Sequence, residues 1–290
     1  MVVARVVGAT LAYLAALSVG AILLYAVGLA LVPGAAQATF GLVSLGVAEG
    51  AALAAVLLVW RFVDRCPIRQ LGLEPDGEGG RWLRGAGTAA AMMGFIILAW
   101  YTLLDGAAWN LNPDPARASL VFVFGWLGFM IQGPAEEILF RGYILENVKA
   151  KWGLGWAVSA SSLTFGLLHS LNPHFGLLPF VNLLLFGVAT ALYKVVVDNG
   201  QLWGVFGIHT VWNWLQQVVF GLPNSGAGPV ADNAVFTISP NTSLPEPIWG
   251  GGFGPEGTLG ASLVLLALIA AILRRRAKLQ KADPGTPAAP

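Results

Sequence analysis

The chain has 290 residues, of which 56% are hydrophobic and only 11% are charged. This composition excludes an ordinary soluble globular protein and predicts an all-α polytopic membrane protein. The net charge is only +1, and no basic run is interleaved with aromatic residues, so we expect no nucleic-acid partner. The single cysteine, Cys66, cannot form an internal disulfide.

About eight transmembrane helices with a polar site in the bundle core are predicted from the apolar runs. Their centres lie in residues 6–32, 39–60, 86–104, 121–148, 155–171, 177–195, 202–220 and 257–273. The first run is too long for the apolar region of a signal peptide, which spans roughly 7 to 15 residues. Residues 221–256 are rich in glycine and proline and lack helical periodicity, so we expect a loop there, which is a candidate lid.

The positions of the cations predict the orientation of these spans. With both termini inside, every lysine and arginine outside the spans falls on the cytoplasmic side except Arg117. The composition, rich in alanine, glycine and leucine, is typical of bacteria. We therefore expect an integral protein of a bacterial cytoplasmic membrane, with its N-terminus and C-terminus inside and the lipid bilayer as its immediate environment.

Residues 132–141 place three charges within a run that reads as a lipid-buried helix. A charge at the centre of a membrane helix costs roughly 2.5 to 3.5 kcal/mol on insertion scales, so such charges mark functional sites. Glu137 and Arg141 are four residues apart and can neutralise each other on one helix face. Glu136 points roughly 100° away from Glu137 around the helix and is free to face a cavity.

Two of the three histidines also fall within predicted spans. His169 shares a helix face with Phe165, and His209 shares one with Asn213. At 1.5 Å per residue, Glu136 and His169 each lie roughly 20 Å from the cytoplasmic end of their span. His209 and Asn213 lie roughly 12 and 18 Å from that end. The four side chains are therefore expected to meet in one site near mid-depth, which we expect to open toward the cytoplasm.

These motifs resemble those of a known family. Glu136-Glu137-x-x-x-Arg141, Phe165-x-x-x-His169 and His209-x-x-x-Asn213 occur in this order on separate spans. The chain resembles the CAAX prenyl endopeptidase and bacteriocin-processing (CPBP, ABI-domain) family of intramembrane glutamate proteases. The resemblance covers about residues 118 to 220, and the remaining spans carry no motif.

The resemblance implies roles for these residues. Glu136 and His169 would activate a water for attack on a peptide carbonyl, and His209 and Asn213 would stabilise the oxyanion. Glu137 and Arg141 would be structural and orient the helix. No metal and no other cofactor is implied. The implied substrate is a membrane-associated protein or peptide, either prenylated at a CAAX-type sequence or related to bacteriocins, and the oligomeric state stays open.

On this basis we divide the chain into five parts. Residues 1–117 hold the N-terminal transmembrane helices with a cytoplasmic loop at 61–85, and residues 118–220 form the catalytic core. The extracytoplasmic loop at 221–256 is followed by the last transmembrane helix at 257–273. Residues 274–290 form a tail that is first basic and then disordered.

Two other kinds of function compete with the endopeptidase. A metal-dependent membrane protease is one alternative, because histidine and glutamate are zinc ligands, although no His-Glu-x-x-His sequence occurs. A non-catalytic membrane scaffold or immunity protein is the other, with the polar residues holding the helices together and the loop at 221–256 docking a partner. The lone Glu49 in the second span is expected to face the bundle interior.

Overall fold

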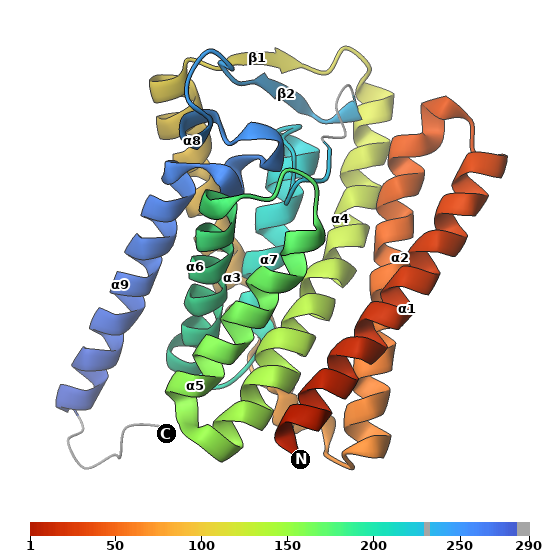
Figure 1. Ribbon diagram of the computed structural model, residues 1–290. Helices are drawn as coiled ribbons and strands as arrows, with labels where there is room; N and C mark the ends of the chain where they lie inside the picture. Colours follow the sequence, from red (N-terminus) through yellow and green to blue (C-terminus); the bar gives the residue numbers. More distant parts are fainter. Residues whose placement is uncertain (229–232, 283–290) are drawn as a thin grey trace.

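Eight long α-helices run up and down through one bundle in the computed structural model, which describes residues 1–228 and 233–282 (Figure 1). They are α1 (Val2–Leu31), α2 (Gln37–Leu58), α3 (Glu78–Phe95), α4 (Pro115–Glu137), α5 (Leu145–Leu168), α6 (Leu177–Leu192), α7 (Trp203–Asn213) and α9 (Leu259–Ala282). Five of them continue into π-helical stretches: η2 (Val59–Val63), η4 (Ile96–Asp105), η5 (Ile138–Ile144), η7 (Tyr193–Val197) and η8 (Trp214–Val219). The predicted all-α fold is confirmed.

Five helical stretches of the described residues are long and apolar enough to cross a membrane. They are Val2–Leu31, Gln37–Val63, Glu78–Asp105, Pro115–Leu171 and Leu177–Val197. The fourth has 57 residues and contains α4 and α5. The chain reverses its direction at Gly153, inside α5. The φ angle of Gly153 is 81°, in the left-handed region, which favours glycine. These apolar stretches identify an integral membrane protein.

The two ends of the bundle differ in charge and in structure. The start of α1 and the end of α9 lie at one end, which we call the termini face, and the short strands lie at the other, the opposite face (Figure 1). The turn at Gly153 and the connection from α2 to α3 also lie on the termini face. The predicted disordered tail falls in residues 283–290, outside the described part of the chain.

A two-stranded antiparallel ribbon covers the opposite face. β1 (Ala108–Leu111) pairs with β2 (Phe236–Ser239), so that Trp109 lies opposite Ile238. The short helix α8 (Glu246–Trp249) follows β2. We expected a loop over residues 221–256, and the structure places the strand β2 and the short helix α8 within it. The local glycine and proline content concealed a strand whose partner lies more than 100 residues earlier in the chain.

Glycines allow the helices that carry the site to approach closely. A Cβ atom on Gly85 of α3 would lie 1.8 Å from the carbonyl oxygen of Gly204 on α7. On α4, a Cβ atom on Gly128 would lie 2.6 Å from the carbonyl oxygen of Leu42 on α2. Small residues at such crossings are how membrane helices pack in the absence of a hydrophobic driving force between them.

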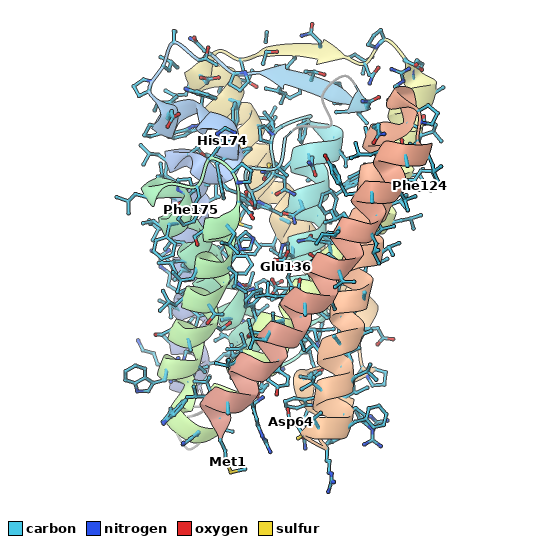
Figure 2. The ribbon with its side chains drawn as sticks, turned by 45° about the vertical axis from the view of Figure 1, so that its right-hand side comes forward. Met1, Asp64, Phe124, Glu136, His174 and Phe175 are labelled. Carbon is cyan, nitrogen blue, oxygen red and sulfur yellow. The ribbon has the colours of Figure 1, made fainter. Side chains whose placement is uncertain are left out.

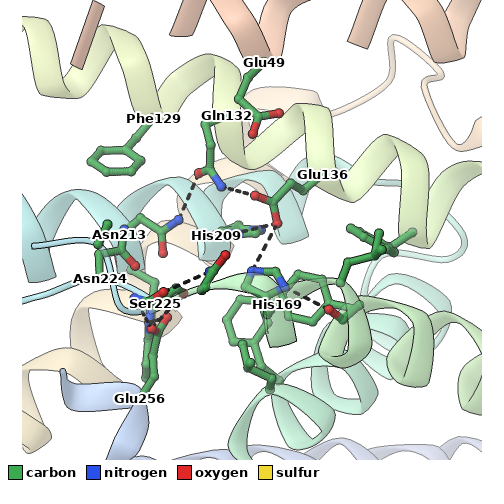
Figure 3. A pocket seen from close by; sticks show the side chains of 18 of the residues that line it. Glu49, Phe129, Gln132, Glu136, His169, His209, Asn213, Asn224, Ser225 and Glu256 are labelled. Atoms are coloured by element: carbon green, nitrogen blue, oxygen red, sulfur yellow. Dashed lines mark hydrogen bonds and ion pairs between the residues drawn. The ribbon is translucent and has the colours of Figure 1, made fainter. Parts of the chain in front are cut away.

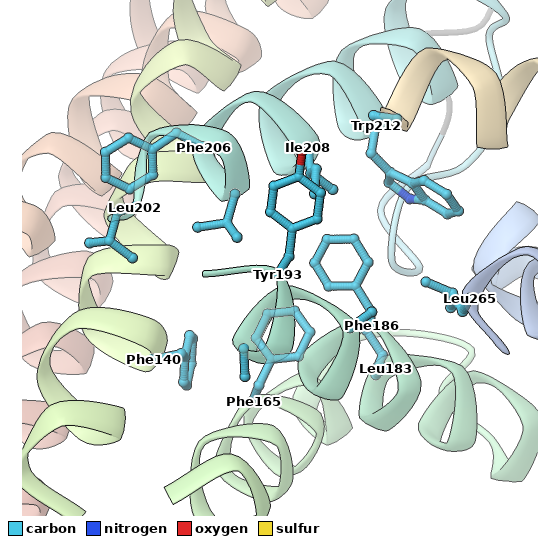
Figure 4. Packing of buried hydrophobic residues seen from close by; sticks show 14 of the residues in the cluster. Phe140, Phe165, Leu183, Phe186, Tyr193, Leu202, Phe206, Ile208, Trp212 and Leu265 are labelled. Atoms are coloured by element: carbon cyan, nitrogen blue, oxygen red, sulfur yellow. The ribbon is translucent and has the colours of Figure 1, made fainter. Parts of the chain in front are cut away.

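Aromatic side chains fill the interior beside the polar residues (Figure 4). Phe165 of α5 lies edge-on to Phe140 at a centroid distance of 5.1 Å and stacks on Phe186 of α6 at 5.9 Å. Phe186 in turn contacts Trp212 of α7. Aromatic pairs of this geometry contribute about 0.5 to 1.5 kcal/mol each beyond the burial of their surface. They hold α5, α6 and α7 in a fixed relation around the site.

Candidate active site

A pocket of about 280 Å³ lies in the bundle interior, surrounded by side chains of most of the long helices (Figure 3). The polar side chains that line it are Glu49, Gln132, Glu136, His169, Asn172, Asn182, His209, Asn213, Gln217, Asn224, Ser225 and Glu256. All four residues predicted for catalysis are among them. The structure therefore brings together groups that lie more than 70 residues apart in sequence.

Glu136 occupies the centre of this polar set. Its Oε2 atom lies 3.9 Å from Nε2 of His169 and 4.0 Å from Nε2 of His209. Both separations are too long for a direct hydrogen bond, and Oε2 is buried without any hydrogen-bond partner among the described residues. An acceptor left open between two imidazoles has the surroundings in which a water molecule binds.

The second ring nitrogen of each histidine is held by a different acceptor. Nδ1 of His169 lies 2.8 Å from the carbonyl oxygen of Phe165, one turn earlier in α5. A carbonyl can only accept, so Nδ1 carries the proton and Nε2 of the neutral ring has a lone pair facing Glu136. Nδ1 of His209 likewise lies 2.8 Å from Oε1 of Glu137.

Glu137 forms a buried ion pair beside the pocket. Arg141 Nη1 donates to Glu137 Oε1 at 3.0 Å, and neither side chain is exposed. The guanidinium also lies 4.5 Å from the ring centroid of Phe165, in cation–π contact. Glu137 therefore contacts both Arg141 and His209, while Glu136, on the neighbouring face of the same helix, is left to the pocket.

Gln132 was missed by the sequence analysis. Its Nε2 donates to Oε1 of Glu136, and its Oε1 accepts from Nδ2 of Asn213 at 2.9 Å. The residue is one helical turn before Glu136, and this spacing was the available signal. A neutral amide in a membrane helix draws less attention than a charge, so the connection between Glu136 and Asn213 appears only in the structure.

Two further acids line the pocket. Glu49 of α2 accepts a hydrogen bond from the Tyr13 hydroxyl of α1 at 2.5 Å, in agreement with the expected inward orientation. Glu256 precedes α9, and its Oε2 accepts from the backbone and hydroxyl of Ser225 at 2.7 and 2.8 Å. Burial raises the pKa of the Glu256 carboxyl, although the hydrogen bonds from Ser225 act in the opposite direction.

Whereas we expected a cytoplasmic opening, the pocket is lined by residues of connections at the opposite face and by none of the described residues in the connections at the termini face. The lining residues that belong to those connections include Asn172, Ser225 and Ala227. The depth estimate placed the four side chains together correctly. It could not reveal which connections take part in the pocket wall, because that depends on how they fold over the helices.

The described residues contain no group of three or more histidine, cysteine, aspartate or glutamate side chains with the geometry of a metal site. The fold and the pocket together define a class of protein. It is a polytopic membrane protein with a buried cluster of glutamate and histidine side chains in its core. Few membrane proteins place so many ionisable groups in the bundle interior without a functional reason.

Comparison with known protein families finds a match for the part of the chain that carries this cluster. Residues 118–215 match the type II CAAX prenyl endopeptidase Rce1-like family. The match runs from the start of α4 to the first turn of η8, and so includes Glu136, His169, His209 and Asn213. This part of the chain is a domain of that family, as the motif resemblance predicted. No curated protein and no solved structure matches the chain.

Proposed function

We propose that the protein is a metal-independent intramembrane endopeptidase that hydrolyses a peptide bond of a membrane-associated substrate. One observation carries the proposal: Glu136 Oε2 has no hydrogen-bond partner among the described residues and lies within 4.0 Å of two imidazole nitrogens. The match of this region to a family of prenyl endopeptidases supports a peptide as the substrate. A prenylated CAAX-type protein and a bacteriocin-like peptide are the candidate substrates.

Glu136 and His169 would act on the attacking water. A water bound between Glu136 Oε2 and His169 Nε2 can give its proton to either acceptor as its oxygen attacks the scissile carbonyl carbon. The neutral tautomer of His169, fixed by the Phe165 carbonyl, leaves Nε2 ready to accept. Protonated Glu136 can then return the proton to the leaving amine as the C–N bond breaks, which regenerates the carboxylate.

His209 and Asn213 would stabilise the tetrahedral oxyanion. The Asn213 amide has one N–H bound to Gln132, so its other N–H is available to an oxyanion. His209 donates from Nε2 only when both ring nitrogens carry protons, and the Glu137 carboxylate beside Nδ1 stabilises that cation. Donors held in place in a poorly solvated site contribute about 2.7 to 4 kcal/mol each to such a transition state.

The test replaces Glu136 with glutamine, which keeps the shape of the side chain and removes its basicity. New protein termini are mapped by mass spectrometry in membranes that contain either the wild-type protein or Glu136→Gln at matched expression. Glu78→Gln, at an exposed position on α3, serves as the matched control. We expect a set of termini that is present with wild type and Glu78→Gln and is lost with Glu136→Gln.

Identical sets of termini from all three proteins, each shown to be folded by its thermal unfolding, would contradict the endopeptidase. The same membranes treated with a chelator provide a second comparison. Termini that disappear with the chelator would show a metal-dependent protease instead, because the proposed water activation needs only protein side chains.

A further inference from the structure

Connections at the opposite face form part of the pocket wall. The outer wall of the pocket is made by Asn172, which follows α5, and by Asn224, Ser225 and Ala227, which follow η8. Ala227 is exposed and Ser225 is half-buried, so the wall ends at the surface of the opposite face. None of the described residues in the connections on the termini face lines the pocket.

Toward the termini face, the bundle beneath Glu136 is closed by a buried ionic network. Arg141, Tyr143 and Lys194 are completely buried. The Lys194 ammonium donates to the carbonyl oxygens of Arg141 and Leu71 at 2.8 and 3.2 Å, and it pairs with Glu146 at 2.6 Å. A peptide could pass here only by breaking contacts among buried charges, which is costly.

The first helix forms another part of the pocket wall and is held to the bundle at the termini face. At the termini face, Arg5 Nε pairs with Asp64 Oδ1 at 3.0 Å, and the Tyr143 hydroxyl donates to Oδ2 of the same carboxylate. Farther along, α1 packs on α2 through Gly20 and slants away from α5 (Figure 2). Tyr13, Leu14 and Leu17 of α1 line the pocket on this side, as does Leu168 of α5.

A free acceptor lies at the outer end of the pocket. Asn224 is only 8% exposed, and its Oδ1 atom is buried without a hydrogen-bond partner among the described residues. Leaving such an acceptor unpaired costs about 1 to 3 kcal/mol. A peptide N–H that enters the pocket from this end would satisfy it, so the position suits an extended substrate chain.

The distribution of lysine and arginine residues indicates on which side of the membrane the opposite face lies. The arginine residues of the α2–α3 connection lie on the termini face, as do Arg5, Lys149, Lys151 and the basic end of α9. Among the described residues, Arg117 is the single cation at the opposite face. Cations accumulate on the cytoplasmic side of membrane proteins, so the opposite face is extracytoplasmic.

From these observations we infer that the pocket is entered from the extracytoplasmic side, between α1 and α5 and past Asn224. Its substrate is then a peptide segment of a membrane-anchored protein that is exposed outside the cytoplasmic membrane. This inference rests on the proposed endopeptidase function and adds the side of entry and the class of substrate. It excludes a chain that is presented from the cytoplasm.

Cysteine labelling tests the side of entry without any need for proteolysis. Asn213→Cys and Leu183→Cys place a thiol in the pocket, each in a Cys66→Ser background. A small, anionic, membrane-impermeant methanethiosulfonate is added to spheroplasts or to inside-out vesicles. Ser243→Cys, at an exposed position after β2, reports the outer side, and native Cys66 reports the inner side.

We expect both pocket thiols to react at least about 10-fold faster in spheroplasts than in inside-out vesicles, as Ser243→Cys does. Faster reaction in inside-out vesicles would overturn the inference. Reaction from neither side, while both reference thiols react, would also overturn it, because the pocket would then be closed to the outer face.

The termini that depend on Glu136 provide a second readout. We expect them to lie in extracytoplasmic segments of membrane-anchored proteins, and termini in cytoplasmic segments would contradict the inference. If no such termini occurred, the endopeptidase would fail while the labelling result would still decide the side of entry. The two failures are therefore distinguishable.

Discussion

Gln132 connects the two halves of the candidate site through one amide group. It donates to Glu136 and accepts from Asn213, which leucine of similar size cannot do. We expect Gln132→Leu to lower kcat about 10- to 100-fold, because misplaced catalytic groups cost rate even when they are present. KM should change little. Steady-state cleavage of an identified substrate measures both constants.

The control for this change is Gln70→Leu, at an exposed position on the termini face, which should leave both constants unchanged. Gln132→Glu separates the effect of the hydrogen bonds of Gln132 from the effect of its size. It keeps the size of the side chain but replaces the amide that donates to Glu136 with a second carboxyl group. If Gln132→Leu cleaved at the wild-type rate, the bridge would have no positioning role.

We expect the buried ion pair of Glu137 and Arg141 to contribute more to the free energy of unfolding than an exposed ion pair does. Arg141→Met leaves the Glu137 carboxylate buried with only His209 as a partner, so we expect a loss of about 3 to 5 kcal/mol in unfolding free energy. Thermal unfolding in detergent measures the change. Arg117→Met breaks an exposed ion pair with Asp114, the residue before α4, and should cost less than about 1 kcal/mol.

Equal effects of the two substitutions would contradict this ranking. A further comparison uses the double variant Glu137→Gln with Arg141→Met. Removing both charges should recover part of the stability that Arg141→Met loses, because no uncompensated charge then remains in the interior.

At the scale of elements, the crossing of α3 and α7 should control the position of His209 and Asn213. Gly85 has no room for a side chain, because its Cβ would meet the Gly204 carbonyl. We expect Gly85→Leu to displace α7 and to abolish both stable folding and cleavage. Gly87→Leu, on the same helix with nothing within 4 Å of its Cβ, should be tolerated. Thermal unfolding and termini mapping compare the two variants.

If Gly85→Leu unfolded at the wild-type temperature, the contact between α3 and α7 would not be as close as described. A second substitution at Gly204 could not restore the stability lost in Gly85→Leu. A Cβ atom at Gly204 would lie 2.1 Å from the Asp198 carboxylate. The two glycines therefore define one crossing that tolerates no side chain on either helix.

The helices themselves were predictable from sequence, whereas much of what surrounds the pocket was not. Uncharged apolar runs predicted the spans, and charges within them predicted Glu136 and His209 as site residues, because both signals are local. The strand β2 pairs with β1 across a long stretch of chain, and local propensity could not reveal it. Glu256 was missed for the same reason, since only the folded connection places it beside the pocket.

At the scale of the whole molecule, the pocket needs more of the chain than the matched family region. Ala261 and Leu265 of α9 line it, and Asn182 of α6 donates to the carbonyl oxygens of Glu256 and Thr258 just before that helix. We expect a chain that ends before Leu259 to lose all Glu136-dependent termini. A chain that ends at Ala282 should keep them and provides the matched control.

Retained cleavage by the shorter chain, at equal expression, would show that α9 is dispensable for the site. Co-expression of the missing helix as a separate segment offers a positive test. Recovery of the Glu136-dependent termini under those conditions would show that α9 acts by completing the pocket wall.

The connection after β2 is tied to the early part of the chain by several contacts. The Trp100 indole donates to the carbonyl oxygen of Ile248, the Tyr101 hydroxyl donates to that of Trp249, and Asp105 accepts from the backbone of Asn241. These contacts span well over 100 residues, so they form only after the last segments have been synthesised. A ribosome-bound chain that already carries Glu136, His169, His209 and Asn213 therefore has an incomplete pocket. If the protein is the proposed endopeptidase, the order of synthesis delays cleavage by the nascent chain until these last segments have folded onto the bundle.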